Sequence, residues 1–279
     1  MISYADGQFL ASEKASIPIA DDTGGSIRGY RIFTSSVIVN GKMPFALHHC
    51  QRLIDGAKTL NMATSITVES LLDILNHTIQ KNPKSSVPLG IKIILTGGIS
   101  VGHTQSGTAK IYISVTPLTL PPQSDYTLGV SLATFPYQRD IAATKLTYYV
   151  GTLLAEPSVQ KYNAKFPLFI SPTTQACLEG DTFNIFFVKN NTLFTPKADG
   201  RILDGISRQA IIRLAPPQYT TIETDIFPDQ FAQFNEAFLT SSIRKVMPVI
   251  TINATQIGNG KPGPVTQHFF DKLTAEVGF

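Results

Sequence analysis

Short runs of hydrophobic residues, of the kind typical of β-strands, recur through the first 120 residues. Three such runs occupy residues 30–39, 90–98 and 109–118. Apolar side chains at intervals of three and four residues predict amphipathic helices at residues 46–62 and 67–82. Thr67, followed two residues later by Glu69, suits the N-cap of the second helix.

The second half of the chain continues the same mixture of elements. Strands are predicted at residues 127–135, 166–171, 177–190, 191–196, 236–241 and 246–253. Helices are predicted at residues 141–156 and 206–215. The Pro-rich residues 118–124 predict an interdomain linker. The pattern therefore predicts an α/β (α+β) protein with a smaller N-terminal α/β domain, residues 1–117, and a larger C-terminal domain, residues 125–279.

Composition and charge narrow the class of protein. The 279 residues are 43% hydrophobic and 15% charged, as expected for a globular protein with a large core. The net charge of +3 comes without a basic run, which gives no support to a nucleic-acid or membrane partner. Cys50 and Cys177 form no CxxC pair, and no basic and then apolar leader opens the chain. We therefore expect a cytoplasmic protein without a disulfide or metal site.

Lys145 is the one positive charge in the apolar stretch 141–156. One interpretation is that its stem lies on apolar surface while its ammonium group reaches water. The other is that burial lowers its pKa and leaves a neutral amine that attacks a carbonyl, the Schiff-base chemistry of pyridoxal 5'-phosphate (PLP) enzymes. The stretch alone leaves both open. A PLP enzyme also needs a carboxylate for the pyridinium nitrogen and an anion site for the phosphate.

Candidates for both groups follow later in the chain. Glu179 closes a mostly apolar run before a Gly-Asp turn, so it either marks the turn or hydrogen-bonds the pyridine nitrogen. Ile206 and Ser207 open a predicted helix, where free N–H groups and a hydroxyl suit a phosphate, although the segment taken alone is better explained by an ordinary N-cap serine. Further hydroxyl groups cluster at Thr240, Ser241 and Ser242.

Five segments, in family order and spread over most of residues 16–267, resemble motifs of the class IV (fold type IV) PLP-dependent aminotransferases. HHCQRLIDGAKTL at residues 48–60 is similar to HLxRLxxSAxxL, and QRDIAATKLTYY at 138–149 to the segment around the Schiff-base lysine. LEGDTFNIFFVKNNTLFTP at 178–196 resembles the family's ExxxxNxFxV and TP block. ILDGISR at 202–208 resembles LPGITR, and GNGKPGPVT at 258–266 resembles a turn near the C-terminus.

The resemblance implies a two-domain fold type IV enzyme, like D-amino-acid aminotransferase, with PLP as its cofactor. It makes Lys145 the Schiff-base and proton-transfer lysine, and Glu179 the partner of the pyridinium nitrogen. Tyr149, four residues after Lys145 and so on the same face of the predicted helix, would approach the ring hydroxyl. The implied phosphate ligands are Arg52, Ile206, Ser207 and Ser242. Family members are homodimers, so we expect a homodimer.

The residues near the substrate depart from the family pattern. In GYRIFTSS, residues 29–36, Arg31 replaces a Gly and Thr34 replaces the Glu of GDGxFE. A Thr at this place resembles 4-amino-4-deoxychorismate lyase, whereas Tyr149 favours the aminotransferases. The implied substrate-binding residues are Tyr30, Arg31, Thr34 and Ser241.

Two enzymatic functions follow from the resemblance. The first is transfer of the amino group of a small α-amino acid, branched-chain or D, to a 2-oxo acid. The alternative is 4-amino-4-deoxychorismate lyase activity, the elimination of pyruvate that gives 4-aminobenzoate in the folate pathway. A non-catalytic family member is a third interpretation, against which the intact Lys145, Glu179 and Arg52 speak. The substrate and its stereochemistry stay open.

Overall fold

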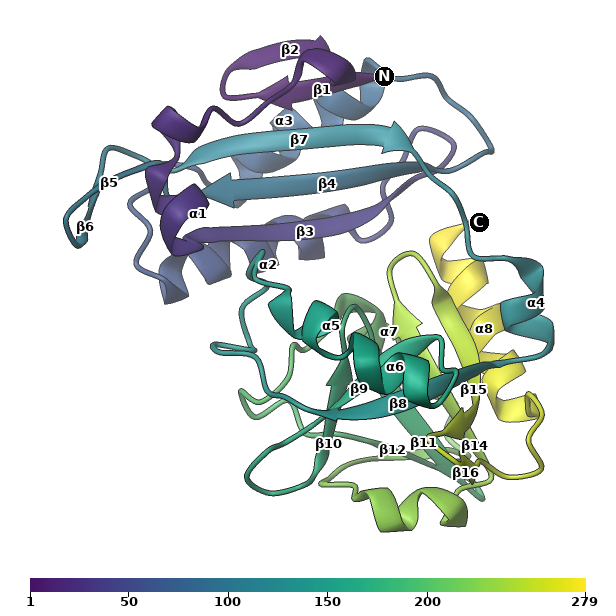
Figure 1. The fold of residues 1–279 in the computed structure, drawn as a ribbon. Coiled ribbons are helices and arrows are strands. Elements are labelled where there is room, and N and C mark those ends of the chain that lie inside the picture. Colours follow the sequence, from purple (N-terminus) through teal and green to yellow (C-terminus); the bar gives the residue numbers. More distant parts are fainter. The chain divides into compact units, whose positions relative to one another are not determined.

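A computed structural model describes residues 1–279, which divide into two compact units (Figure 1). The first unit comprises Met1–Thr119, Thr144–Tyr148 and Val277–Phe279. The second comprises Leu120–Ala143 and Tyr149–Glu276. Lys145 thus belongs to the first unit, whereas the sequence placed it in the C-terminal domain. The predicted domains, residues 1–117 and 125–279 joined by 118–124, stay a prediction, which separate expression of the two segments would test.

A five-stranded antiparallel sheet forms the first unit. Its strands, in spatial order, are β2 (Gln8–Ala11), β1 (Ile2–Ala5), β7 (Lys110–Pro117), β4 (Leu89–Thr96) and β3 (Arg31–Ile38). The helices are α1 (Thr23–Arg28), α2 (Ala46–Thr59) and α3 (Val68–Gln80), and a hairpin adds β5 (Ile99–Val101) and β6 (Thr104–Ser106). In Figure 1, α2 and α3 lie along the sheet. β3 is the last strand at one edge of the sheet.

The helical periodicity of this unit is confirmed by its core. Leu53 and Ile54 of α2 are buried in one cluster with Ile91 and Ile93 of β4, while Lys92 between the two isoleucines is exposed. Burying each of these side chains contributes about 1.5–3 kcal/mol. The α3 N-cap is Thr67 as predicted, with Ser70 completing a capping box.

The predicted helix over residues 141–156 is wrong in its first half. Helix α5 (Val150–Leu154) begins only after Tyr149, which is its N-cap residue. Lys145 and Tyr149 therefore do not share a helical face.

Residues 144–148 instead lie antiparallel beside β3. The N–H of Phe33 donates to the Lys145 carbonyl oxygen at 2.9 Å, and the N–H of Thr147 donates to the Arg31 carbonyl oxygen at 3.2 Å. Ile32 and Leu146 form the bridge between these two bonds, and Leu146 packs against the core of the first unit. The unpaired backbone groups of an edge strand are the physical reason, because they offer hydrogen bonds that a helix here would leave unmade.

A mixed sheet forms the second unit. Its strands, in spatial order, are β10 (Cys177–Gly180), β9 (Phe166–Ile170), β8 (Val130–Pro136), β15 (Lys245–Ile252), β14 (Glu236–Ser241), β11 (Asn184–Lys189), β12 (Thr192–Thr195) and β13 (Thr220–Glu223), with β16 (Thr255–Gln256) beside β15. The pairs β8–β9, β8–β15 and β12–β13 are parallel. The predicted strand at 177–190 is two strands, because a turn at residues 181–183 separates β10 from β11.

Five helices belong to this part of the chain. They are α4 (Gln123–Thr127), α5, α6 (Glu156–Lys161), α7 (Ile206–Leu214) and α8 (Pro264–Val277). α7 packs against β14. The buried Glu236 of β14 accepts hydrogen bonds from the N–H groups of Val265 and Thr266 at 3.0 and 2.7 Å, and so caps the first turn of α8. None of the helices combines the length and the apolar character of a membrane span.

Candidate active site

The Lys145 side chain has a defined place in the first unit. Its carbonyl is tied to β3, and its ammonium nitrogen lies 4.8 Å from the centre of the Phe33 ring, a cation–π contact. The residue is half-buried. A lysine on a solvated helix would be free to sample many rotamers, whereas this one is anchored through the backbone and the ring. Such an arrangement suits a nucleophile, which has to be positioned before it reacts.

Thr34, His49 and Arg52 form a hydrogen-bonded cluster on β3 and α2. Arg52 Nη2 donates to Thr34 Oγ1 at 2.6 Å, and Thr34 Oγ1 lies 2.5 Å from His49 Nδ1. A guanidinium group only donates, and Arg52 Nη2 also lies 3.5 Å from His49 Nδ1, so Nδ1 is an acceptor. The Thr34 oxygen accepts from Arg52, and its own hydrogen points to His49 Nδ1. These directions assign the neutral tautomer to His49, with its proton on Nε2.

Electrostatics favour the same protonation state. Burial first, and then the positive charges of Arg52, Lys145 and His48, hold the pKa of His49 well below its ordinary value of 6.5. His49 is fully buried, while the neighbouring His48 is exposed, so the two rings occupy different sides of α2. His49 therefore acts as a neutral hydrogen-bond acceptor next to Arg52.

Tyr30 and Arg31, the predicted substrate-binding residues, have partners within the first unit. The Tyr30 hydroxyl donates to the Leu60 carbonyl oxygen at 2.7 Å. Arg31 forms an ion pair with the fully buried Asp22 and donates to Ser26 Oγ at 3.0 Å. A substrate carboxylate at Arg31 would compete with Asp22, a partner that the sequence analysis did not find. Their role toward a substrate stays a prediction.

Glu179 lies near the end of β10 and is 4% exposed. Arg139 forms an ion pair with its Oε1, and the N–H of Leu203 donates to the same oxygen at 3.2 Å. The guanidinium carbon of Arg139 also lies 5.8 Å from the centre of the Tyr149 ring, so Glu179, Arg139 and Tyr149 form one cluster in the second unit. Burial raises the pKa of the Tyr149 phenol, which keeps it protonated. A carboxylate held among donors in this way is charged and fixed in orientation.

The start of α7 carries the second part of the site. Gly205 is the N-cap residue and contributes no side-chain cap, so the N–H groups of Ile206 and Ser207 begin a helix without one. Asn184 Nδ2 donates to the Leu203 carbonyl oxygen at 2.8 Å, and a methyl group at Gly205 would lie 2.2 Å from Asn184 Oδ1. The chain from Glu179 to the helix start is therefore packed without spare room.

The hydroxyl cluster lies on β14 and the turn that follows it. Thr240 faces Asn184 in the β11–β14 ladder, and its buried Oγ1 has no hydrogen-bond partner within the chain. Ser241 Oγ accepts from the N–H of Arg244 at 3.1 Å, and Ser242 occupies the turn. The Thr240 hydroxyl, on the strand against which α7 packs, is therefore available to a ligand or a water molecule.

Residues 31–252 match the family model of the amino-transferases of class IV. That range covers more than half of the chain.

The chain belongs to the class IV aminotransferases.

Individual relatives are distant but extend over nearly the whole chain. The chain is 25% identical over 280 residues to the D-alanine aminotransferase of Staphylococcus haemolyticus, with 95% of this chain and 93% of the relative covered. The branched-chain aminotransferase of Thermoproteus uzoniensis, solved with norvaline, has the same fold, with a TM-score of 0.88 at 21% identity over 100% of this chain and 95% of that one. A Legionella pneumophila protein provisionally described as a 4-amino-4-deoxychorismate lyase gives a TM-score of 0.82 at 23% identity, over 95% and 98%.

Class IV aminotransferases use PLP, and the donor groups of this member fit that cofactor. The uncapped start of α7 and the unpaired Thr240 hydroxyl are suited to a phosphate group. The charged Glu179 is suited to a protonated pyridine nitrogen. These groups all lie in the second unit, and the Leu203–Asn184 contacts connect them.

Three residues of this site were missed by the sequence analysis or given no role. Arg139 lies six residues before Lys145, where the family's lysine segment begins with an Arg, and this match was the signal that could have found it. Asn184 is the one polar residue at the start of the apolar strand NIFFV. His49 stands in the HHCQRL segment, and the sequence analysis assigned no role to it.

Proposed function

We propose that this class IV aminotransferase transfers the amino group of a small α-amino acid, of branched-chain or D type, to a 2-oxo acid. The observation that carries the proposal is the connected path in the second unit from the buried Glu179 through Leu203 and Asn184 to Gly205 at the start of α7. This path joins a fixed carboxylate, which suits the pyridine nitrogen of PLP, to an anion-binding helix start, which suits its phosphate.

Each residue then has a defined task. Glu179 keeps the ring nitrogen protonated, with Arg139 holding the carboxylate charged and in place. Ile206, Ser207 and Ser242 receive the phosphate, together with the unpaired hydroxyl of Thr240. The family resemblance assigns Arg52 as a further phosphate ligand and Tyr149 as the residue near the ring hydroxyl.

In the proposed reaction Lys145 supplies the reactive amine. PLP, when bound, draws electrons from the substrate α-carbon and so makes its proton acidic. Lys145 would hold the cofactor through its amine and, when that amine is free, would accept and return the α-proton. The backbone pairing with β3 supports this task because it fixes the root of the side chain.

A half-reaction assay tests the proposal. A transaminase converts its cofactor to pyridoxamine phosphate when the amino acid alone is added, so the visible absorbance of the purified enzyme should bleach in a single turnover. Addition of pyruvate or 2-oxoglutarate should restore it. A panel of L- and D-amino acids identifies the substrate class, and absence of bleaching by every member of the panel would contradict the proposal.

Lyase activity is the second candidate, favoured by Thr34 and by the fold shared with the Legionella pneumophila protein. A lyase needs no oxo acid and ends each turnover with its visible absorbance unchanged. Release of pyruvate from 4-amino-4-deoxychorismate, without bleaching by any amino acid, would replace the first proposal with this one.

We also infer a homodimer and a cytoplasmic, reducing environment. The homodimer rests on the family resemblance, and light scattering after size-exclusion chromatography tests it. The environment is supported by the free, buried thiols of Cys50 and Cys177, and burial raises the pKa of Cys50 to about 12.

A further inference from the structure

Arg208 is a charged residue in a place where a charge is costly. It is the third residue of α7, and its side chain is 2% exposed. A cation in the first turn of a helix is disfavoured by the helix dipole, and burial removes its hydration. Its Nε has no hydrogen-bond partner. Stability alone gives little reason for an arginine here, because apolar residues of similar volume often serve a buried site equally well.

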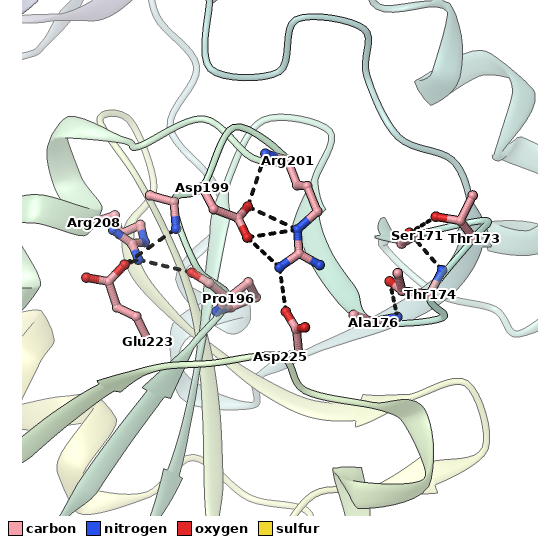
Figure 2. A network of polar contacts seen from close by, with 11 residues as sticks. Ser171, Thr173, Thr174, Ala176, Pro196, Asp199, Arg201, Arg208, Glu223 and Asp225 are labelled. Carbon is pink, nitrogen blue, oxygen red and sulfur yellow. Dashed lines mark hydrogen bonds and ion pairs between the residues drawn. The ribbon is translucent and has the colours of Figure 1, made fainter.

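The contacts of Arg208 bracket the loop between β12 and α7. Nη2 donates to the carbonyl oxygen of Pro196, at the beginning of the loop, at 3.0 Å, and Nη1 donates to Asp204 Oδ1, at its end, at 2.8 Å. Glu223 of β13 forms a further ion pair with Nη2 (Figure 2). One guanidinium group thus joins both ends of the loop to the edge of the sheet.

A second arginine braces the middle of the same loop. Arg201 forms ion pairs with Asp199, inside the loop, and with Asp225, just after β13, each at 2.6 Å. Figure 2 shows Arg201 lying between these two carboxylates. The N–H of Ala198 also donates to Glu223 Oε2 at 3.4 Å. The loop is therefore held at its beginning, middle and end.

The braced loop supplies the groups that orient both parts of the proposed cofactor site. Its Leu203 donates to Glu179 through the N–H and accepts from Asn184 through the carbonyl. Gly205 follows directly and begins α7. A shift of the loop would therefore move the Glu179 carboxylate and the helix start relative to each other.

We propose that Arg208 is a positioning residue that sets the spacing between Glu179 and the anion-binding start of α7. The expected effect on PLP binding rests on the proposed function. The effect of Arg208 on the position of the loop does not depend on it. Lysine at this position keeps the charge but cannot bridge a carbonyl and two carboxylates, because its ammonium is a single point on a flexible stem.

The test compares Arg208→Lys with Arg213→Lys, a control on the same helix whose arginine is 57% exposed and forms a surface ion pair with Glu276. PLP titration of the apoenzyme should show affinity weakened about tenfold by Arg208→Lys, the size of one lost hydrogen bond to a charged group. Exchange of the Leu203 amide hydrogen should accelerate by a similar factor, while the amides of β14 stay protected. Arg213→Lys should change neither quantity.

Two outcomes overturn the inference. One is a folded Arg208→Lys protein with wild-type amide exchange at Leu203, and the other is PLP affinity equal to that of Arg213→Lys. If the wild-type protein binds no PLP, the proposed function fails and the amide exchange alone decides the positioning role. If Arg208→Lys does not fold, Glu223→Gln removes one bracket contact and should give the same changes on a smaller scale; unchanged exchange in that variant overturns the inference as well.

Discussion

Arg139 donates to the carboxylate of Glu179 inside the second unit, where the two side chains are only 9% and 5% exposed. A carboxylate at this depth requires a partner, because an unpaired buried charge is strongly destabilising. The pairing leaves Glu179 ionised and available to a second donor, the Leu203 N–H. A buried, oriented carboxylate of this kind suits a hydrogen bond to the protonated pyridine nitrogen of PLP.

Glu179→Gln should bind PLP but lose most of its turnover. The amide cannot hold the ring nitrogen protonated, so the ring draws electrons less strongly from the α-carbon. We expect kcat to fall by about a hundredfold, equivalent to about 2.7 kcal/mol in the barrier. Steady-state kinetics measure it, with Asp181→Asn, two residues along the chain, as the control. Activity within a few-fold of the wild type would indicate that Glu179 is only a structural residue of the turn.

Lys145 should be the residue that carries the cofactor. Borohydride reduction of the purified yellow enzyme should attach PLP to the peptide that contains Lys145, as detected by mass spectrometry. Lys145→Ala should lose this label and at least about a thousandfold in kcat, since covalent and proton-transfer catalysis are both removed. Lys165→Ala, which removes an ion pair with Asp125 elsewhere in the second unit, is the control. A label on another lysine contradicts the assignment.

Thr34→Val should weaken PLP binding, whereas Thr34→Ser should not. Valine has nearly the shape of threonine but neither accepts from Arg52 nor donates to His49, so the guanidinium loses the hydroxyl that orients it. The dissociation constant should rise about tenfold, as for a lost hydrogen bond to a charged group. In an Arg52→Gln background the same change should have little further effect. Equal PLP affinities of the Val and Ser variants would show that the Thr34 hydroxyl does not orient Arg52 for PLP binding.

His49 should make the protein less stable in mild acid. Its pKa is lower in the folded chain than the unfolded value of 6.5, so below that pH the unfolded chain binds one proton more. Unfolding free energy should therefore decrease as the pH falls from about 6.5 toward the folded pKa, by up to about 1.4 kcal/mol per pH unit. Denaturant titrations of the apoenzyme measure the slope. His49→Gln should remove this contribution and His48→Gln, at an exposed position, should retain it; an unchanged slope in His49→Gln would refute the assignment.

Gly205→Ala should disturb the site through Asn184. The backbone at Gly205, with φ of −68°, accepts an alanine, so the cost comes from the 2.2 Å approach to Asn184 Oδ1 and not from strain in the chain. Overpacking of this kind costs about 1–3 kcal/mol. Thermal unfolding and PLP titration should both show the loss. The double variant with Asn184→Ala should be less impaired than the sum of the single changes, and strict additivity would exclude the clash.

The sequence by itself determined many of the local elements, and it determined the family. The helices at α2 and α3 and the strands β3, β4 and β7 follow from side-chain periodicity, because one buried face imposes a period of 3.6 or 2 wherever it occurs. The order of the motifs around Arg52, Lys145, Glu179 and Ser207 identified the class IV aminotransferases, which the family match over residues 31–252 confirms. A periodic pattern and a motif are each carried by a short segment of the chain.

Tertiary structure alone decided how these residues are held. Residues 144–148, TKLTY, were predicted as helix together with the apolar residues around them, whereas hydrogen bonds to the edge strand β3, more than a hundred residues away, hold them extended. The hydrogen bond between Thr34 and His49 depends on a strand and a helix packing together. The contact of Leu203 with Glu179 and the bracket of Arg208 around its loop join segments that no sequence period relates. Such hydrogen bonds and ion pairs form between side chains that are close in space, and their closeness cannot be read from the spacing of the residues along the chain.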